Sequence, residues 1–278
     1  MTTTVTAATR QYPPGLAGEV LAGYGDRVVL HDLYDAVGAP VYHDLAAADT
    51  SEIREVLRVA RAVTGPVLEL ASGSGRLTLP LLALGRGVTA LELKAEMLDL
   101  LRERLAAAPA GLRARCVPVQ GDMAAFELGR TFGLVVLGTT SVSLLDDAGR
   151  AGLFASVRAH LAPGGRFLLS TVDMVDPEDE SARATDLDIE GQGASGRRYR
   201  MIEHWPEGAP ARRVTILPPA AEAATADRIE VLTTSIRVLP AQRLERELAD
   251  AGLRITARHT LPASGPRHRD VLLEAEGV

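Results

Sequence analysis

Residues 66–76 combine an apolar run, a carboxylate and a glycine-rich turn, which suits them to hold a nucleotide-like ligand. They read Pro-Val-Leu-Glu-Leu-Ala-Ser-Gly-Ser-Gly-Arg, and a helix-like stretch follows from Leu77 to Leu84. Glycines let the backbone approach a ligand closely, and the N-terminus of the next helix offers free N–H donors. The segment therefore predicts a strand, a turn and a helix that bind a nucleotide-like cofactor.

The turn differs from the G-x-G-x-x-G pattern of dinucleotide-binding folds. After Gly73 and Gly75, the position of the third glycine is occupied by Thr78, and Glu69 lies just ahead of the turn. A carboxylate there opposes a pyrophosphate but suits a ligand that carries positive charge. The chain also lacks a Tyr-x-x-x-Lys pair, so an NAD-dependent reductase is the weaker alternative.

Two more acidic residues follow strand-like runs. Glu92 lies near the end of the run 87–93, 17 residues after Gly75, and Asp122 follows the run 115–119. An acidic residue at the end of the second strand of such a unit accepts hydrogen bonds from both ribose hydroxyls and would repel a 2′-phosphate. The spacing therefore indicates an adenosine-type ligand without that phosphate.

The run Glu-Leu-Ala-Ser-Gly-Ser-Gly at 69–75 resembles the E-x-G-x-G-x-G signature of class I S-adenosylmethionine (SAM) methyltransferases, with Ala71 in place of the first glycine. The resemblance covers roughly residues 50–175. It implies SAM as cofactor and S-adenosylhomocysteine (SAH) as product, with Met97 near the adenine and Asp122 accepting from the adenine amino group. The cofactor-binding residues that it implies are Glu69, Ala71, Ser72, Gly73, Gly75, Arg76, Glu92, Leu93, Met97, Gly121, Asp122, Met123, Leu137, Gly138 and Thr139.

Strands alternate with helices through the middle of the chain, which predicts a doubly wound α/β fold. We expect strands at 66–71, 87–93, 113–119, 132–138, 166–173, 254–261 and 270–275, and helices at 76–84, 95–107, 146–161 and 240–251. Asp49 and Glu52 suggest a capping box for a further helix that begins near Ile53. The resemblance implies a Rossmann-like sheet of seven strands, the last of them antiparallel.

The alternation breaks after Val172, and this break defines the expected domains. Residues 174–196 are acidic and rich in Gly and Ser, which indicates a loop, and the strand-like runs 198–204, 212–217 and 228–238 follow without a helix. We therefore expect an N-terminal arm or cap at 1–48, whose first 25 residues are mobile, a SAM-binding core at 49–175 and 239–278, and an antiparallel β insertion at 176–238 that covers the substrate.

Methyl transfer from a sulfonium is an in-line displacement, so the main task of the protein is to position the acceptor. A base is needed only when the acceptor arrives protonated or is weakly nucleophilic. We expect Tyr34 and Tyr42 to orient the acceptor and His43 to assist with its proton. The candidate substrate contacts are Thr140, Ser141, Asp173, His204 and Trp205. No metal site is predicted, and Cys116 is the single cysteine.

Composition excludes several classes of partner. The net charge of −6 and the pI of about 5.6 disfavour nucleic-acid binding. No run is long and apolar enough to cross a membrane, and the N-terminus does not resemble a signal peptide, so we expect a cytoplasmic protein that acts without a membrane. A homodimer is a further possibility that the sequence leaves open.

The acceptor is expected to be an amine, on a peptide or a small molecule, because no metal site is available to activate an alcohol. The runs Leu-Ala-Ser-Gly-Ser-Gly-Arg-Leu (70–77) and Leu-Gly-Thr-Thr-Ser-Val-Ser-Leu-Leu (137–145) resemble methyltransferases of daptide-type ribosomal peptide (RiPP) biosynthesis. That resemblance implies N,N-dimethylation of a modified C-terminal amine. The alternatives are N- or O-methylation of an aminosugar or another secondary metabolite, and a noncatalytic SAM-binding module.

Overall fold

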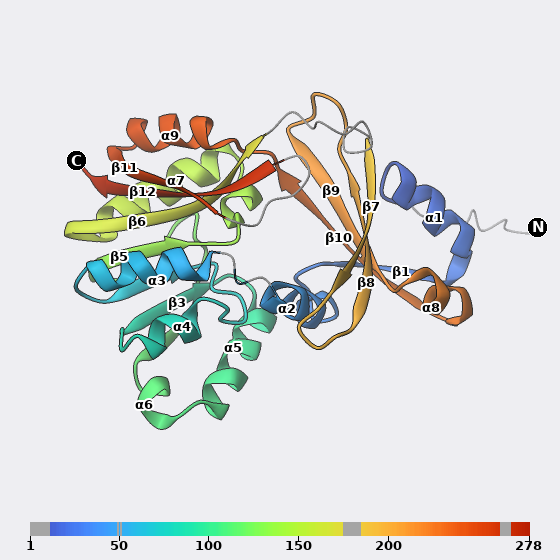
Figure 1. Cartoon of the computed structure of the whole chain (residues 1–278), viewed down its shortest axis with the longest axis horizontal. Coiled ribbons are helices and arrows are strands. Elements are labelled where there is room, and N and C mark those ends of the chain that lie inside the picture. Colours follow the sequence, from blue (N-terminus) through green and yellow to red (C-terminus); the bar gives the residue numbers. More distant parts are fainter. Residues whose placement is uncertain (1–11, 49, 51, 175–184, 262–267) are drawn as a thin grey trace, which may run out of the picture.

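Two β-sheets, each with its own helices, organise the chain (Figure 1). The computed structural model describes residues 12–48, 50, 52–174, 185–261 and 268–278. The larger sheet has the strand order β11-β12-β6-β5-β2-β3-β4. Its strands are β2 (Val67–Leu70), β3 (Val88–Glu92), β4 (Cys116–Gln120), β5 (Phe132–Leu137), β6 (Leu161–Met174), β11 (Leu253–Thr260) and β12 (His268–Gly277).

This sheet is the doubly wound class I sheet that the sequence predicts. β12 runs antiparallel to both of its neighbours, and the other paired strands are parallel. The helices around it are α3 (Ile53–Ala62), α4 (Thr78–Ala83), α5 (Ala95–Ala107), α6 (Ala110–Arg113), α7 (Asp147–His160) and α9 (Ala241–Asp250), with the 3₁₀ helix η2 (Ser141–Leu144) after β5. Buried side chains of α3, α4 and α5 form one core, and those of α7 and α9 form a second core on the other face.

The smaller sheet has five strands in the order β1-β10-β9-β8-β7. They are β1 (Val28–Asp32), β7 (Asp186–Gln192), β8 (Arg198–His204), β9 (Ala211–Leu217) and β10 (Ile229–Arg237). β1 pairs parallel with β10, whereas the other pairs are antiparallel. The remaining elements in this half are α1 (Leu16–Tyr24), the 3₁₀ helix η1 (Gly25–Arg27), α2 (Gly38–Ala48) and α8 (Ala220–Thr225).

The structure corrects three predictions about this half. The expectation that no helix interrupts the strand-like runs from 198 to 238 is wrong, because Ala220–Thr225 form α8 between β9 and β10. The loop predicted at 174–196 is wrong for 186–192, which form β7, and the mobile arm predicted at 1–25 is wrong for 16–24, which form α1. β7 is an edge strand whose residues are exposed or half-buried, so it lacks the apolar alternation that identifies a strand. Residues 1–11 and 175–184 lie outside the described residues.

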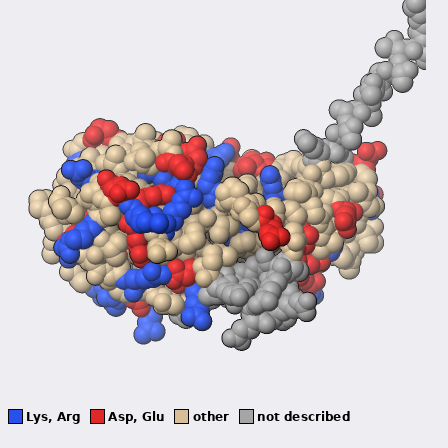
Figure 2. Space-filling view, turned by 90° about the horizontal axis from the view of Figure 1, so that it is seen from above, with Lys and Arg blue, Asp and Glu red and all other residues tan. Residues whose placement is uncertain are grey.

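Charged groups of both signs alternate on the molecular surface. The face seen in Figure 2 shows Lys and Arg side chains interleaved with Asp and Glu, without a continuous basic patch. Within the described part of the chain, every helix is too short or too polar to cross a membrane.

Asp44 links α2 to the tip of the β7–β8 hairpin. Its carboxylate accepts hydrogen bonds from Ser195 N (2.7 Å), Ser195 Oγ (2.7 Å) and the Tyr199 hydroxyl (2.9 Å). Its own carbonyl accepts from Ala194 N at 2.9 Å. α2 therefore moves with the five-stranded sheet, although it also contacts α5 of the larger half.

Replacing Asp44 with Ala is expected to lower the free energy of unfolding by about 2 kcal/mol, because three hydrogen bonds to one carboxylate are lost. Urea denaturation of the purified protein measures this change. Asp99→Ala serves as the control, since Asp99 makes an exposed i,i+3 pair with Arg102 that is worth about 0.5 kcal/mol or less. Equal, small effects of the two substitutions would contradict the proposed link.

Candidate active site

A cavity of about 240 Å³ lies beside the carboxyl ends of β2, β3 and β5, where ligands bind in open α/β sheets. Both halves of the molecule contribute to its wall. Tyr34, Tyr42 and Ala46 come from the N-terminal segment and Ile236 from β10, while the remaining lining residues belong to the larger half.

Most residues implied as cofactor-binding line this cavity. They are Glu69, Ala71, Ser72, Gly73, Arg76, Glu92, Leu93, Met97, Gly121, Asp122, Met123, Gly138 and Thr139. Gly75 and Leu137 lie behind the wall. A Cβ on Gly75 would approach Leu101 Cδ1 to 2.5 Å, so Gly75 lets the turn pack closely on α5.

The glycine-rich turn has the backbone that its sequence predicts. Gly73 and Gly75 adopt positive φ, and Ala71 takes the same region with φ 48°. Glu92 fixes the turn against the end of β3, because its two carboxylate oxygens accept from Gly73 N (2.8 Å) and Lys94 N (2.9 Å). Ala71 thus takes the place of the glycine in the family pattern. Its left-handed backbone is strained, but the course of the turn is kept.

Ser72 provides an unused polar atom in the cavity wall. Its side chain is buried, and its Oγ has no hydrogen-bond partner among the described residues. Buried polar atoms are almost always paired, so an unpaired one that faces a cavity indicates a ligand. Leu93, beside it, leaves 53% of its surface exposed, which offers an apolar cover for a planar ring.

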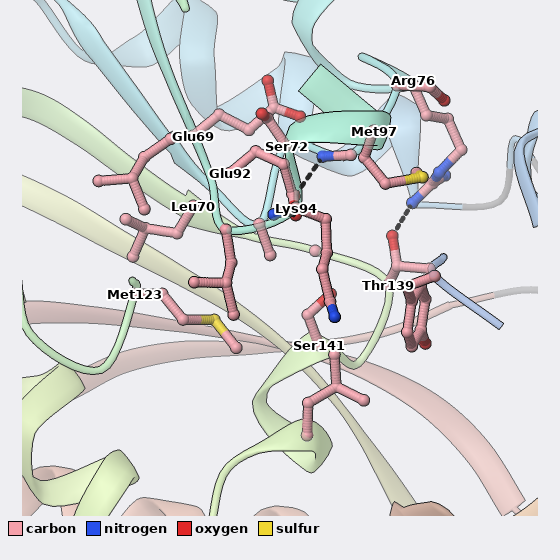
Figure 3. Close-up of a pocket in the computed structure, with 18 of the residues that line it drawn as sticks. Glu69, Leu70, Ser72, Arg76, Glu92, Lys94, Met97, Met123, Thr139 and Ser141 are labelled. Carbon is pink, nitrogen blue, oxygen red and sulfur yellow. Dashed lines mark hydrogen bonds between the residues drawn. The ribbon is translucent and has the colours of Figure 1, made fainter. Parts of the chain in front are cut away.

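Glu69 is a buried carboxyl at the bottom of the same cavity (Figure 3). The Thr78 hydroxyl donates to its Oε2 at 2.5 Å. Burial raises the pKa of Glu69 to about 8, so the group holds a proton at neutral pH. A cation that enters the cavity favours the charged carboxylate. The ammonium of SAM is such a cation. The unpaired Ser72 hydroxyl, the Glu92 carboxylate at the position expected for ribose binding and the exposed Leu93 side chain also fit this cofactor.

A buried ion pair lies at the wall of the cavity. Arg76 donates to Glu52 Oε1 (2.6 Å) and to Thr139 Oγ1 (2.6 Å), and Thr139 N donates to both oxygens of Glu52 (3.1 and 3.0 Å). The capping-box role predicted for Glu52 is therefore wrong, because its side chain makes no cap and points to the site. Asp49 lies outside the described residues.

The loop after β5 is strained where this ion pair holds it. Thr139 (φ 56°) and Thr140 (φ 53°) both take the left-handed region, which disfavours β-branched residues. A Cβ on Gly138 would lie 2.3 Å from Glu52 Oε1, so a larger residue there would displace the Glu52 carboxylate. Thr140 and Ser141 of this loop, which the sequence predicts as substrate contacts, line the cavity.

The two tyrosines predicted at the methyl-transfer site lie together in the cavity wall. Tyr34 and Tyr42 pack edge to face with ring centroids 5.1 Å apart. Desolvation, followed by the charges of Tyr42, Asp32 and Glu92, raises the pKa of the Tyr34 phenol. The Tyr34 phenol therefore stays protonated at neutral pH.

His43 lies behind the cavity wall and contacts Ser74, which lines it. The distance from His43 Nδ1 to Ser74 Oγ is 2.6 Å. Burial, and then the nearby Arg104, lowers the pKa of His43, so the ring is neutral at pH 7. Within the described residues, His43 thus reaches the cavity wall through its contact with Ser74.

Three further predicted substrate contacts lie outside the main cavity. Asp173 forms an ion pair with Arg258, and His204 Nδ1 lies 2.8 Å from Asp186 Oδ1, beside the start of α1. Both side chains are thus engaged in structural pairs. The Arg212 guanidinium lies over the Trp205 ring, with its Cζ 4.7 Å from the ring centroid. Trp205 lines a narrow crevice that Thr140 and Ile236 also line.

Sequence reasoning missed several residues of the site. The capping-box pattern around Glu52 suggested a helix cap instead of a contact with the site. Ile236 belongs to β10, and no local sequence pattern indicates that this strand reaches the cavity. Lys94 also lines the cavity, and its rarity in this chain was the available signal. The described residues contain no group of three or more His, Cys, Asp or Glu side chains suited to a metal ion.

Glu69→Gln is expected to change how stability depends on pH. Because the pKa of Glu69 is raised from 4.5 to about 8, the folded state holds a proton that the unfolded chain releases above pH 4.5. The contribution of protonated Glu69 to the free energy of unfolding is full below pH 4.5 and is lost as the pH rises towards 8. Wild type should lose free energy of unfolding relative to the variant by up to about 1.4 kcal/mol per pH unit.

Urea denaturation at several pH values between about 5 and 8 measures this difference. Glu55→Gln is the control, because Arg58 lowers the pKa of that half-buried carboxyl, so its contribution to stability is constant in this pH range. Parallel stability curves for wild type and Glu69→Gln would show that Glu69 is ionised in the folded protein.

Comparisons with known proteins agree with this geometry. A family model described as a methyltransferase domain matches residues 67–165. The comparison with curated proteins gave no match. The glycopeptide N-methyltransferase MtfA, in complex with sinefungin, is 41% identical and has a TM-score of 0.67, with 94% of this chain and 97% of that chain covered.

Two other solved structures extend the comparison. MtfA in complex with SAM is 39% identical with a TM-score of 0.64, over 94% of this chain and 97% of that chain. The CcbJ methyltransferase from Streptomyces caelestis is 23% identical with a TM-score of 0.67, over 92% and 98% of the two chains, and supports the fold alone. Together with the cavity, the similarity over nearly the whole length shows that the chain belongs to the SAM-dependent methyltransferase family and uses SAM as methyl donor, with SAH as product.

Proposed function

We propose that the protein N-methylates an amine of a peptide natural product, and that the acceptor is the modified C-terminal amine of a ribosomally made, daptide-type precursor, which receives two methyl groups. The observation that carries the proposal is the similarity to a glycopeptide N-methyltransferase, 41% identical over 94% of this chain. The resemblance of residues 70–77 and 137–145 to daptide-type enzymes supports the finer assignment.

The wall of the cavity favours an amine as nucleophile. SAM supplies an electrophilic methyl group, whose transfer to the nitrogen lone pair breaks the carbon–sulfur bond and leaves SAH. An amine needs only to be desolvated and deprotonated for this attack, whereas an alcohol needs a base or a metal. The phenol of Tyr34 stays protonated and His43 lies behind the wall, so no described side chain in the predicted trio is placed as a strong base.

The predicted catalytic residues then have distinct tasks. Tyr34 and Tyr42 form an aromatic wall that excludes water and orients the acceptor nitrogen. His43 is a positioning residue, because it reaches the cavity only through Ser74. The proton that the amine releases leaves to solvent, since the acidic groups Glu69 and Glu92 belong to the cofactor side of the cavity.

Incubation of the purified protein with SAM and a synthetic peptide that carries a C-terminal amine should give products heavier by one and then two methyl groups. The matched control peptide carries the same amine acetylated, and it should remain unchanged. Mass spectrometry of the peptide and measurement of SAH follow the reaction. SAM binding with no SAH from the peptide or from aminosugars would instead indicate the noncatalytic SAM-binding module.

Tyr34→Phe and Tyr42→Phe are each expected to lower kcat by about tenfold or more, because a misplaced acceptor loses the alignment that displacement requires. The dissociation constant of SAH, measured by calorimetry, should stay within about twofold, since each substitution removes only a hydroxyl and keeps the aromatic ring in the cavity wall. Tyr12→Phe is the matched control, because the Tyr12 hydroxyl donates to Gly25 O, away from the site. Unchanged kcat in both site variants would remove the tyrosines from the mechanism.

A further inference from the structure

Lys94 is the single lysine of the chain, among 30 basic Lys and Arg residues. It lines the main cavity although it is exposed to solvent. Every other cationic position in the chain is occupied by Arg, so the use of Lys is confined to the mouth of the active site. The position therefore calls for a reason beyond general surface charge.

The local structure gives no such reason. Lys94 is the N-cap residue of α5 and makes no side-chain cap. Ser, Thr, Asp and Asn stabilise this position, and a positive charge at a helix N-terminus opposes the helix dipole. Glu92, two residues earlier, accepts from the backbone N of Lys94 and does not pair with its ammonium. Lys94 is thus unfavourable for the helix that it begins, as residues in functional sites often are.

The ammonium of Lys94 is free to bind an anion. Among the described residues, no carboxylate or carbonyl lies within hydrogen-bonding or ion-pair distance of it. The other cation of the cavity wall, Arg76, is already paired with Glu52. Figure 3 shows the Lys94 side chain extended across the cavity towards Ser141. Lys94 is therefore the available positive charge at this opening.

Two hydroxyls lie on the wall that the ammonium faces. Thr140 and Ser141 line the cavity, and their hydroxyl groups have no hydrogen-bond partner within the described ranges. The strained backbone at Thr139 and Thr140 holds them there. An ammonium together with two hydroxyl donors is a suitable set for one carboxylate.

We propose that Lys94, Thr140 and Ser141 form a carboxylate-binding subsite for the acceptor, so that the protein selects amines that carry a carboxylate near the reacting nitrogen. The inference rests on the proposed amine methylation. On a ribosomal peptide whose C-terminus is an amine, the carboxylate belongs to an acidic side chain close to that end. The subsite anchors the acceptor at one point, while Tyr34 and Tyr42 orient its nitrogen.

The carboxylate of the cofactor is the competing source of negative charge. The groups that fit the cofactor, Glu69, Ser72 and Glu92, lie on β2, the glycine-rich turn and β3. Thr140 and Ser141 lie on the loop after β5, next to Ile236 of the five-stranded sheet. Because η2 contacts β10 of the smaller sheet, we assign Thr140, Ser141 and the ammonium that points towards them to the acceptor rather than to the cofactor.

Lys94→Met is expected to lower kcat/KM by about tenfold or more for an amine peptide with a neighbouring Glu, because a hydrogen bond to a charged group is lost. For the same peptide with Gln at that position the change should stay within about twofold. Arg102→Met, on the outer side of α5 where Arg102 pairs with Asp99, should leave both acceptors unaffected. Equal loss for both peptides, or no loss for either, would overturn the subsite.

Binding of SAH to Lys94→Met, measured by calorimetry, separates the two sources of charge. An unchanged dissociation constant supports the acceptor subsite. A dissociation constant raised by about tenfold would assign Lys94 to the cofactor carboxylate and overturn the proposal.

A labelling experiment tests the subsite without any methyl transfer, so it stays informative if the proposed function fails. An amine-reactive ester acylates a single lysine in this chain, and mass spectrometry of the peptide containing Lys94 gives its rate. With SAH present, propionate should slow the acylation of Lys94 and propionamide, which has neither a charge nor a reactive amine, should not. Equal protection by the two probes, or none by propionate at saturating concentration, would show that no carboxylate binds at Lys94.

Discussion

The buried ion pair between Glu52 and Arg76 holds together three segments that would otherwise be independent. Glu52 precedes α3, Arg76 ends the glycine-rich turn, and both contact Thr139 in the loop after β5. An isolated charge in this place would be costly, and removal of one partner of a buried pair typically costs about 3–5 kcal/mol. The pair also offsets the strain of two consecutive threonines in the left-handed region, so the shape of the methyl-transfer end depends on it.

The two sheets divide the work of the site between them. The seven-stranded sheet provides the turn, the acids and the apolar cover that fit the cofactor, and these residues lie close together in sequence. The smaller half contributes Tyr34, Tyr42, Ala46 and Ile236 to the cavity wall, and we assign this part of the wall to the acceptor. Asp44 makes this wall depend on the tip of the β7–β8 hairpin, about 150 residues further along the chain. Acceptor choice can thus change through the smaller sheet while the cofactor side stays the same.

The cofactor half of the site was predictable because its signals are local. The strand, glycine turn and acids occupy short windows, and the expected strands and helices of the larger sheet are confirmed within a few residues, apart from the longer β6. The acceptor half was less predictable. β7 is an exposed edge strand without apolar alternation, and Glu52 carries a capping pattern that its tertiary contacts override. Asp173 lies at the end of β6 as expected, but Arg258 of β11, on the other side of β12, forms an ion pair with it.

The parallel pairing of β1 with β10 has a consequence for the order in which the protein assembles. Val28 pairs with Ile229 and Asp32 with Thr233, so the two strands are about 200 residues apart in sequence. Contacts of such separation form late, because the intervening loop must close first. During synthesis from the N-terminus, β1 and the tyrosines that follow it have no sheet to join until β10 has emerged. The segment that carries the acceptor wall is made first but reaches its place after the cofactor-binding strands have been synthesised.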